Sequence, residues 1–139
     1  MKSIHLFIAS VMLVIASGCA TPRSSADIAA STLRGTWNFE MDTGRGITLG
    51  SMDINRKVVG REGSLMTNRG PNVLPVRTLT LDNRAMALSV ESPNGMVVFK
   101  GELSRDGNAF EGKVTYHDGQ VFTMKGMRGP PLVTAGPRA

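Results

Sequence analysis

The side chains best suited to chemistry are few in this chain and lie far apart. The chain has one cysteine, Cys19, and two histidines, of which His117 lies beside Asp118-Gly119 in a turn pattern. A metal site needs three or four ligands, and a catalytic triad needs a nucleophile that a histidine can serve. Asp118 alone is not a ligand set, so we interpret His117 as an exposed turn residue. We expect no metal site and no enzymatic activity.

Asp42-Thr43-Gly44 matches the triplet that carries the catalytic aspartate in aspartic proteases. Those enzymes need two such aspartates sharing one proton, and this chain contains one copy of the triplet. Ala or Ser typically follows the triplet in that family, whereas Arg45 follows it here. The same three residue types favour a tight turn. We interpret the triplet as a hairpin turn, with a protease as the alternative.

Methionines are frequent, and their thioether sulfurs are ligands for soft metals. Alternation along the predicted strands places most of them on apolar faces, where methionine fills irregular gaps in a core. We therefore assign them to the core, with soft-metal capture as the alternative. The seven that follow Cys19 are Met41, Met52, Met66, Met86, Met96, Met124 and Met127.

Residues 1–18 have the three parts of an export signal. Lys2 gives a positive start, an apolar run follows from Ile4 to Ile15, and the small residues Ala16-Ser17-Gly18 precede Cys19. The run is shorter than the roughly 20 apolar residues of a membrane-spanning helix. We expect removal of residues 1–18, which leaves 121 of the 139 residues, enough for one domain.

This segment resembles the lipobox of bacterial lipoproteins, although Ala16 stands where that family usually has Leu. The resemblance implies a diacylglycerol on the thiol of Cys19 and a further acyl chain, such as palmitate, on its amine. Ala20 follows where an inner-membrane retention signal has Asp, which implies an outer-membrane protein facing the periplasm. The alternative is a secretory peptide cut after Ala16 or Gly18, which leaves Cys19 as a free thiol. We expect no other cofactor.

The net charge of the chain and the composition of its two terminal segments limit the possible partners and the extent of the folded domain. Without Lys2 the chain has 15 basic and 11 acidic side chains, a net charge of +4, and the basic residues are scattered. This pattern favours weak attraction to anionic lipid and excludes a nucleic-acid stripe with interleaved aromatics. Residues 19–33 are predicted to be a flexible tether, with a helical turn possible within 26–33. Residues 129–139, rich in Pro and Gly, are predicted to be a loose tail that packs locally at Leu132 and Val133.

Turn dipeptides recur every 12 residues in the second half of the chain. They are Asp82-Asn83, Asn94-Gly95, Asp106-Gly107 and Asp118-Gly119, and Gly70-Pro71 lies one interval earlier. Such pairs readily adopt the positive φ angles of tight hairpins. The segments between them alternate apolar and polar residues, so residues 34–128 are predicted to form antiparallel strands.

The first strands are less regular. Trp37, Phe39 and Met41 alternate with polar residues, but the next strand changes parity between Leu49 and Met52, which predicts a bulge at Gly50-Ser51. A bent third strand is predicted over 58–66 and a fourth over 73–81, with Pro75 at its start or on an exposed edge. We predict an all-β meander of about eight strands, closed or nearly closed into an up-and-down barrel, with a β-sandwich as the alternative.

The domain is similar to calycins, the lipocalin-like barrels. Gly35-Thr36-Trp37 corresponds to their Gly-x-Trp signature in the first strand, and Arg128 corresponds to the arginine that ends their last strand. The resemblance implies that Arg128 lies across the Trp37 indole at the closed end of the barrel. Phe99-Lys100-Gly101 and Phe110-Glu111-Gly112 also resemble small lipocalin-like modules of bacterial envelope proteins, in which aromatics cover the gaps left by glycines.

Two classes of function are compatible with this reading. The first is a membrane-tethered binding module that holds a small apolar or lipid-like molecule inside the barrel. The second is a structural or interaction lipoprotein of the envelope with a solid core and a protein partner. Oligomeric state stays open. The expected ligand-contacting residues, which accompany Trp37 inside the barrel, are Phe39, Met41, Met86, Leu88, Phe99, Phe110 and Phe122.

Overall fold

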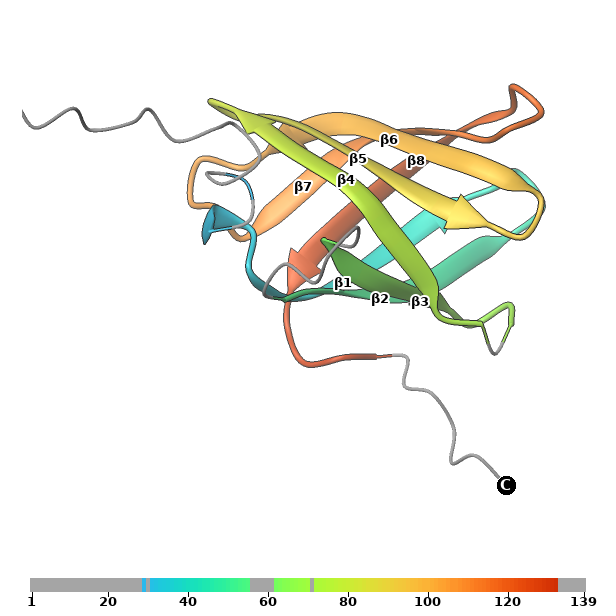
Figure 1. Ribbon diagram of the computed structural model, residues 1–139, viewed down its shortest axis with the longest axis horizontal. Helices are drawn as coiled ribbons and strands as arrows, with labels where there is room; N and C mark the ends of the chain where they lie inside the picture. Colours follow the sequence, from blue (N-terminus) through green and yellow to red (C-terminus); the bar gives the residue numbers. More distant parts are fainter. Residues whose placement is uncertain (1–28, 30, 56–61, 71, 133–139) are drawn as a thin grey trace, which may run out of the picture.

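Eight antiparallel strands form a closed up-and-down barrel in the computed structural model, which describes residues 29, 31–55, 62–70 and 72–132 (Figure 1). Each strand pairs with the next, and β8 pairs with β1. The predicted barrel is therefore confirmed, and the sandwich alternative is excluded. No helix within the described ranges is long and apolar enough to cross a membrane. The strands are β1 Gly35–Asp42, β2 Ile47–Ile54, β3 Gly63–Thr67, β4 Leu74–Asp82, β5 Ala85–Ser92, β6 Gly95–Leu103, β7 Ala109–Thr115 and β8 Val121–Arg128.

The two ends of the barrel differ. Figure 1 shows the β1–β2, β3–β4, β5–β6 and β7–β8 connections together at one end, on the right of the view. We call this end, formed by the described residues of 43–46, 68–73, 93–94 and 116–120, the mouth. The β4–β5 and β6–β7 turns lie at the opposite end with the segment that precedes β1, and we call this the closed end.

The 12-residue turn spacing is confirmed. Asn83, Gly95, Gly107 and Gly119 have φ angles of 53°, 137°, 72° and 84°, in the left-handed region that tight reversals require. Pro75 is the second residue of β4, as predicted. The first part of the predicted third strand lies outside the described residues, and β3 begins at Gly63.

The predicted bulge in β2 is wrong. The β1–β2 register runs without a shift from Gly35 opposite Ile54 to Asp42 opposite Ile47. Thr48 faces inward, and the apolar side chains of Ile47 and Leu49 face outward with exposed fractions of 51% and 38%. The prediction from apolar–polar alternation was wrong here because apolar residues of β2 lie on the outer face of the barrel near the mouth. Among the described strands, the register shift occurs instead in the β4–β5 pair, between Val76 and Thr78.

The predicted tether extends too far into the domain. Ala29 and Leu33 are fully buried and belong to the core, and the amide of Leu33 donates to the carbonyl of Ala29 at 2.8 Å in a single helical turn. The Trp37 indole Nε1 donates to the Leu33 carbonyl at 2.8 Å. Two apolar side chains are enough to anchor this turn beneath the barrel, and the turn plugs the closed end.

The signature residues adopt the arrangement that the calycin-like motif implies. The Arg128 guanidinium lies 4.3 Å from the centre of the Trp37 ring. Its nitrogens donate to the carbonyls of Thr32 at 2.5 Å, Arg34 at 2.7 Å and Gly107 at 3.0 Å. Gly35 lies beside this arginine at a φ of 119°, a conformation that residues with a side chain rarely adopt, so the backbone rather than the contact with Arg128 requires glycine here.

The start of the predicted loose tail is held against the outer face of the barrel. The amide of Leu132 donates to Asn38 Oδ1 at 2.9 Å and to Ser51 Oγ at 3.0 Å. Asn38 Nδ2 donates to the carbonyl of Pro130 at 2.6 Å. These bonds attach residues 130–132 to β1 and β2, while the Leu132 side chain is 69% exposed. Residues 133–139 lie outside the described residues.

Candidate functional site

A cavity of about 80 Å³ occupies the half of the barrel nearest the mouth. Ten of its thirteen lining side chains are apolar, so the cavity favours an apolar occupant. The barrel is not hollow throughout its length. The lining residues are Phe39, Met41, Leu65, Thr67, Leu74, Leu88, Val90, Ser92, Val97, Phe99, Val114, Tyr116 and Met124.

Aromatic packing separates this cavity from the closed end. The Phe110 ring packs against Trp37 at a centroid distance of 5.6 Å and against Phe99 at 5.3 Å in an edge-to-face arrangement. Edge-to-face pairs are favourable because the positive ring edge meets the negative ring face. Phe39 and Phe99 line the cavity, whereas Phe110 and the fully buried Trp37 do not.

Four of the seven expected ligand-contacting residues line the cavity: Phe39, Met41, Leu88 and Phe99. The other three do not line it. Met86 and Phe110 are buried in the half nearer the closed end, and Phe122 packs edge-to-face on Tyr116 at 5.3 Å. Alternation of apolar and polar residues located the inward face of most strands, but it does not indicate how far along the barrel axis each residue lies.

Sequence reasoning missed the remaining nine lining residues, among them Tyr116 and Val97. They lie on the inward parity of the strand segments nearest the mouth or directly beyond a strand. That parity was a signal available in the sequence. The sequence did not indicate which end of the barrel stays open, because this depends on the burial of Ala29 and Leu33 beneath the opposite end.

Polar atoms of the cavity wall gather near the mouth. Within the described residues, the Tyr116 hydroxyl has one acceptor, the sulfur of Met41 at 3.9 Å, which is a weak acceptor. Burial raises the pKa of Tyr116 above its ordinary value, while Arg69 lowers this pKa and Asp118 raises it. The phenol is therefore a neutral donor at physiological pH. Ser92, in contrast, uses its hydroxyl to bond the carbonyl of Gly95 at 2.7 Å.

The Asp42-Thr43-Gly44 triplet forms a turn at the mouth. Asp42 Oδ1 accepts the amide of Gly44 at 2.8 Å, and Thr43 Oγ1 donates to the carbonyl of Gly46 at 2.8 Å. His117 is exposed in the β7–β8 turn. Among the described residues, no group of three or more His, Cys, Asp and Glu side chains is placed to hold a metal ion.

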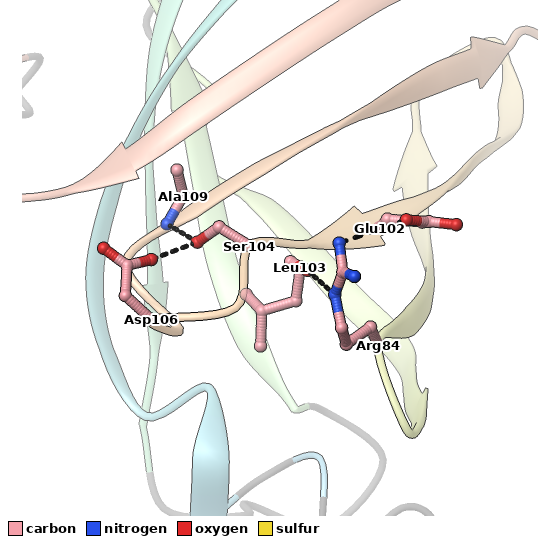
Figure 2. Close-up of polar contacts among 6 residues, drawn as sticks. All are labelled: Arg84, Glu102, Leu103, Ser104, Asp106 and Ala109. Carbon is pink, nitrogen blue, oxygen red and sulfur yellow. Dashed lines mark hydrogen bonds and ion pairs between the residues drawn. The ribbon is translucent and has the colours of Figure 1, made fainter.

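A second polar cluster lies at the closed end, in the β6–β7 turn (Figure 2). Ser104 Oγ donates to Asp106 Oδ1 at 2.5 Å and accepts the amide of Ala109 at 2.9 Å. Arg84 Nε donates to the carbonyl of Leu103 at 2.7 Å, and its Nη2 lies 3.3 Å from Glu102 Oε2. These contacts link neighbouring turns, and Arg84, Glu102 and Ser104 also line one end of an outer groove. Because each contact holds a turn in place, we assign the cluster to turn structure.

The outer wall carries a shallow groove of about 1080 Å³, bounded mainly by residues of β1, β7, β8 and the segment 129–132 and at its edges by Leu49, Arg84, Glu102 and Ser104. The ion pair between Lys125 Nζ and Glu40 Oε1, at 2.8 Å, crosses its floor. The Glu40 side chain raises the pKa of Lys125. The groove is much wider than the internal cavity but is open and partly charged.

The described residues thus define a small closed antiparallel β-barrel with an apolar cavity below its mouth. No family model matches the chain, and no curated protein matches it. Among solved structures, a redesigned β-barrel is similar at 23% identity and a TM-score of 0.52, covering 73% of this chain and 96% of its own.

Two further designed proteins have the same fold. A de novo designed fluorescence-activating β-barrel is 17% identical with a TM-score of 0.50, and the similarity covers 73% of this chain and 97% of that one. A redesigned β-barrel solved with bound DFHBI is 15% identical with a TM-score of 0.50, covering 73% and 98%. At these identities the similarity shows the eight-stranded barrel architecture alone.

Proposed function

We propose that this protein is a membrane-tethered binding module of the bacterial cell envelope, which holds a small apolar molecule in the cavity below the barrel mouth. The cavity carries the proposal, because ten of its thirteen lining side chains are apolar and because it lies near one end of the barrel. Two of the similar designed barrels are described as fluorescence-activating or as bound to DFHBI, so barrels of this size accommodate small ligands.

Cavity size restricts the ligand. An engineered apolar cavity of about 150 Å³ stays dry and binds benzene, and the cavity here measures about 80 Å³. Met41 and Met124 are cross-strand partners in its wall. Methionine side chains are flexible and adapt to irregular volumes. A compact ligand fits with modest movement of these two side chains, whereas a full-length lipid chain does not.

A matched pair of valine substitutions tests the binding function. Val114→Phe places a larger side chain in the cavity, while Val121→Phe makes the same change at an outer-face position that is 53% exposed. Native mass spectrometry of gently purified protein, followed by extraction and identification of released molecules, should find a stoichiometric ligand in the wild type and in Val121→Phe. Val114→Phe should be ligand-free, with thermal unfolding used to verify that it folds.

A wild-type protein that never carries a small molecule and binds neither xenon nor benzene contradicts this function. That outcome favours the second candidate, an interaction lipoprotein. The observation in favour of the second candidate is the outer groove along β1, β7 and β8.

The membrane location rests on the sequence around Cys19, which lies outside the described residues. We propose that Cys19 carries the acyl chains and that Ala20 directs the protein to the outer membrane, facing the periplasm. Cys19→Ser should remove the protein from the membrane fraction and abolish incorporation of labelled palmitate. An unlabelled wild type, or a membrane-bound Cys19→Ser protein, contradicts the lipid anchor.

A further inference from the structure

A buried hydroxyl without a hydrogen-bond partner among the described residues lies beside the cavity, next to the lining residue Met41 and outside the lining itself. Thr48 is 3% exposed, and its Oγ1 has no hydrogen-bond partner within the part of the chain that the structure describes. Thr48 shares the inward parity of Met52 and Ile54 on β2. A buried hydroxyl that lacks a partner costs about 1–3 kcal/mol. Such a group is unusual in a folded protein and requires an explanation.

Thr48 and Tyr116 lie on either side of one flexible residue. Met41 is the cross-strand partner of Thr48, and directly opposite side chains in an antiparallel pair have Cβ atoms about 4.5–5.5 Å apart. The Tyr116 hydroxyl donates to the Met41 sulfur at 3.9 Å. Met41 thus contacts the Tyr116 hydroxyl, for which its sulfur is a weak acceptor, and lies opposite the unpartnered Thr48 hydroxyl. The Met41 side chain also lines the cavity.

An oxygen in place of the Met41 sulfur would satisfy both groups. A hydroxyl accepts one hydrogen bond from the neutral Tyr116 phenol and donates another to Thr48 Oγ1, whereas a thioether sulfur accepts weakly and donates nothing. Apart from Thr67 and Ser92, the remaining side chains of the cavity wall are apolar. The charged groups that act on Tyr116 are Arg69 and Asp118, which have opposite signs, so the site does not favour a charged head group.

From this arrangement, which rests on the proposed binding function, we infer the chemical class of the ligand. It is a compact neutral alcohol or phenol whose apolar body fills the cavity and whose oxygen bridges Tyr116 Oη and Thr48 Oγ1. Displacement of the Met41 side chain makes room for it. The site is thereby selective for one hydroxyl group over both a pure hydrocarbon and an anion.

Benzene, phenol and benzoate form a matched probe series for this inference, since they share one ring and differ in the polar group. Their dissociation constants are measured by calorimetry for the wild type, Tyr116→Phe and Thr48→Val. Thr115→Val is the control, because Thr115 is an exposed outward residue beside Tyr116. Thermal unfolding of each variant verifies that it folds.

We expect phenol to bind more tightly than benzene or benzoate in the wild type. Each substitution should reduce the preference for phenol over benzene by about 2- to 12-fold, the range of one net neutral hydrogen bond. Benzene affinity should stay unchanged in both variants, and Thr115→Val should behave like the wild type.

The outcomes separate the ligand class from the binding function. A preference for phenol that survives both substitutions, or falls in only one variant, overturns the bridging oxygen but leaves an apolar binding cavity. Tighter binding of benzoate than of phenol overturns the neutral class in favour of an anion. Failure of benzene, phenol and xenon to bind the wild type overturns the proposed function together with this inference.

Discussion

The ring of Phe110 occupies the space that a side chain at position 126 would need. Phe110 and Gly126 are cross-strand partners on β7 and β8, and a Cβ at Gly126 would overlap two ring atoms and lie 2.8 Å from the Asn38 carbonyl oxygen. The same relationship joins Phe39 to Gly50 across β1 and β2. Glycines allow a small barrel to curve sharply, and the neighbouring aromatic covers the gap that each glycine leaves.

Gly126→Ala should therefore destabilise the barrel by about 1–3 kcal/mol, the usual cost of overpacking a core. Gly70→Ala is the matched control, because a Cβ there meets nothing within 4 Å, and its effect should stay within about 0.5 kcal/mol. Denaturant unfolding measures both. Equal effects of the two substitutions would show that Phe110 moves aside freely.

Trp37→Ala tests whether the indole is a core element of the closed end. Trp37 is fully buried and packs against Phe110, so its truncation should cost about 3–5 kcal/mol. Trp37→Phe, which keeps an aromatic ring, should cost less. Circular dichroism during urea unfolding reports the change. A negligible effect of Trp37→Ala would contradict the plugged closed end.

Arg128→Lys tests the arginine that joins the N-terminal turn to the barrel. Lysine keeps the charge but cannot reach the carbonyls of Thr32, Arg34 and Gly107 together, because its ammonium is a single point on a flexible stem. We expect a loss of about 1–3 kcal/mol. Arg105→Lys, an exposed change in a turn at the same end, should be nearly neutral. Similar unfolding midpoints for the two variants would falsify the role of Arg128.

Tyr116 should titrate above its ordinary pKa of about 10 because burial disfavours the phenolate. Its folded-state pKa is raised, so the stability it contributes is present below pH 10 and is lost as pH rises through the folded value. Tyr116 is the only tyrosine in the chain, so ultraviolet absorbance reports it alone. A midpoint at or below 10 would contradict its half-buried position at the mouth.

Asp106 and Asp118 should titrate below 3.8. The hydrogen bond from the Ser104 side chain is the main cause for Asp106, and the bond from the Gln120 amide is the main cause for Asp118. Lowered folded-state pKa values contribute stability above the unfolded value, and this stability is lost as pH falls through the folded values. The double variant Asp106→Asn, Asp118→Asn should therefore differ most from the wild type at neutral pH. The difference in unfolding free energy should shrink toward pH 2.

Local patterns in the sequence predicted most of the fold. The turn dipeptides every 12 residues and the alternation between them predicted an eight-stranded meander, because hairpin turns and strand faces depend on neighbouring residues. The Gly35, Trp37 and Arg128 signature located the closed end. Residues 47–49 misled the prediction, since alternation cannot distinguish an inner apolar face from an exposed one near the mouth.

The depth of the cavity was decided by tertiary structure alone. Whether a given inward residue borders empty space depends on contacts between residues far apart in the chain, such as Leu33 with Trp37 and Phe99 with Phe110. These contacts fill the closed half and leave Met86 and Phe110 without access to the cavity.

The sequence by itself determined the strand order, the hairpin turns and the inward face of most strands, together with the expectation of a lipid anchor at Cys19. Only the tertiary structure decided which end of the barrel is filled, and that the Tyr116 hydroxyl borders the remaining space while the Thr48 hydroxyl lies buried beside it. The physical reason is that periodicity reports the environment of single positions. Packing volume and hydrogen-bond satisfaction, which distinguish Thr48 and Tyr116 from other inward residues, arise when all eight strands meet.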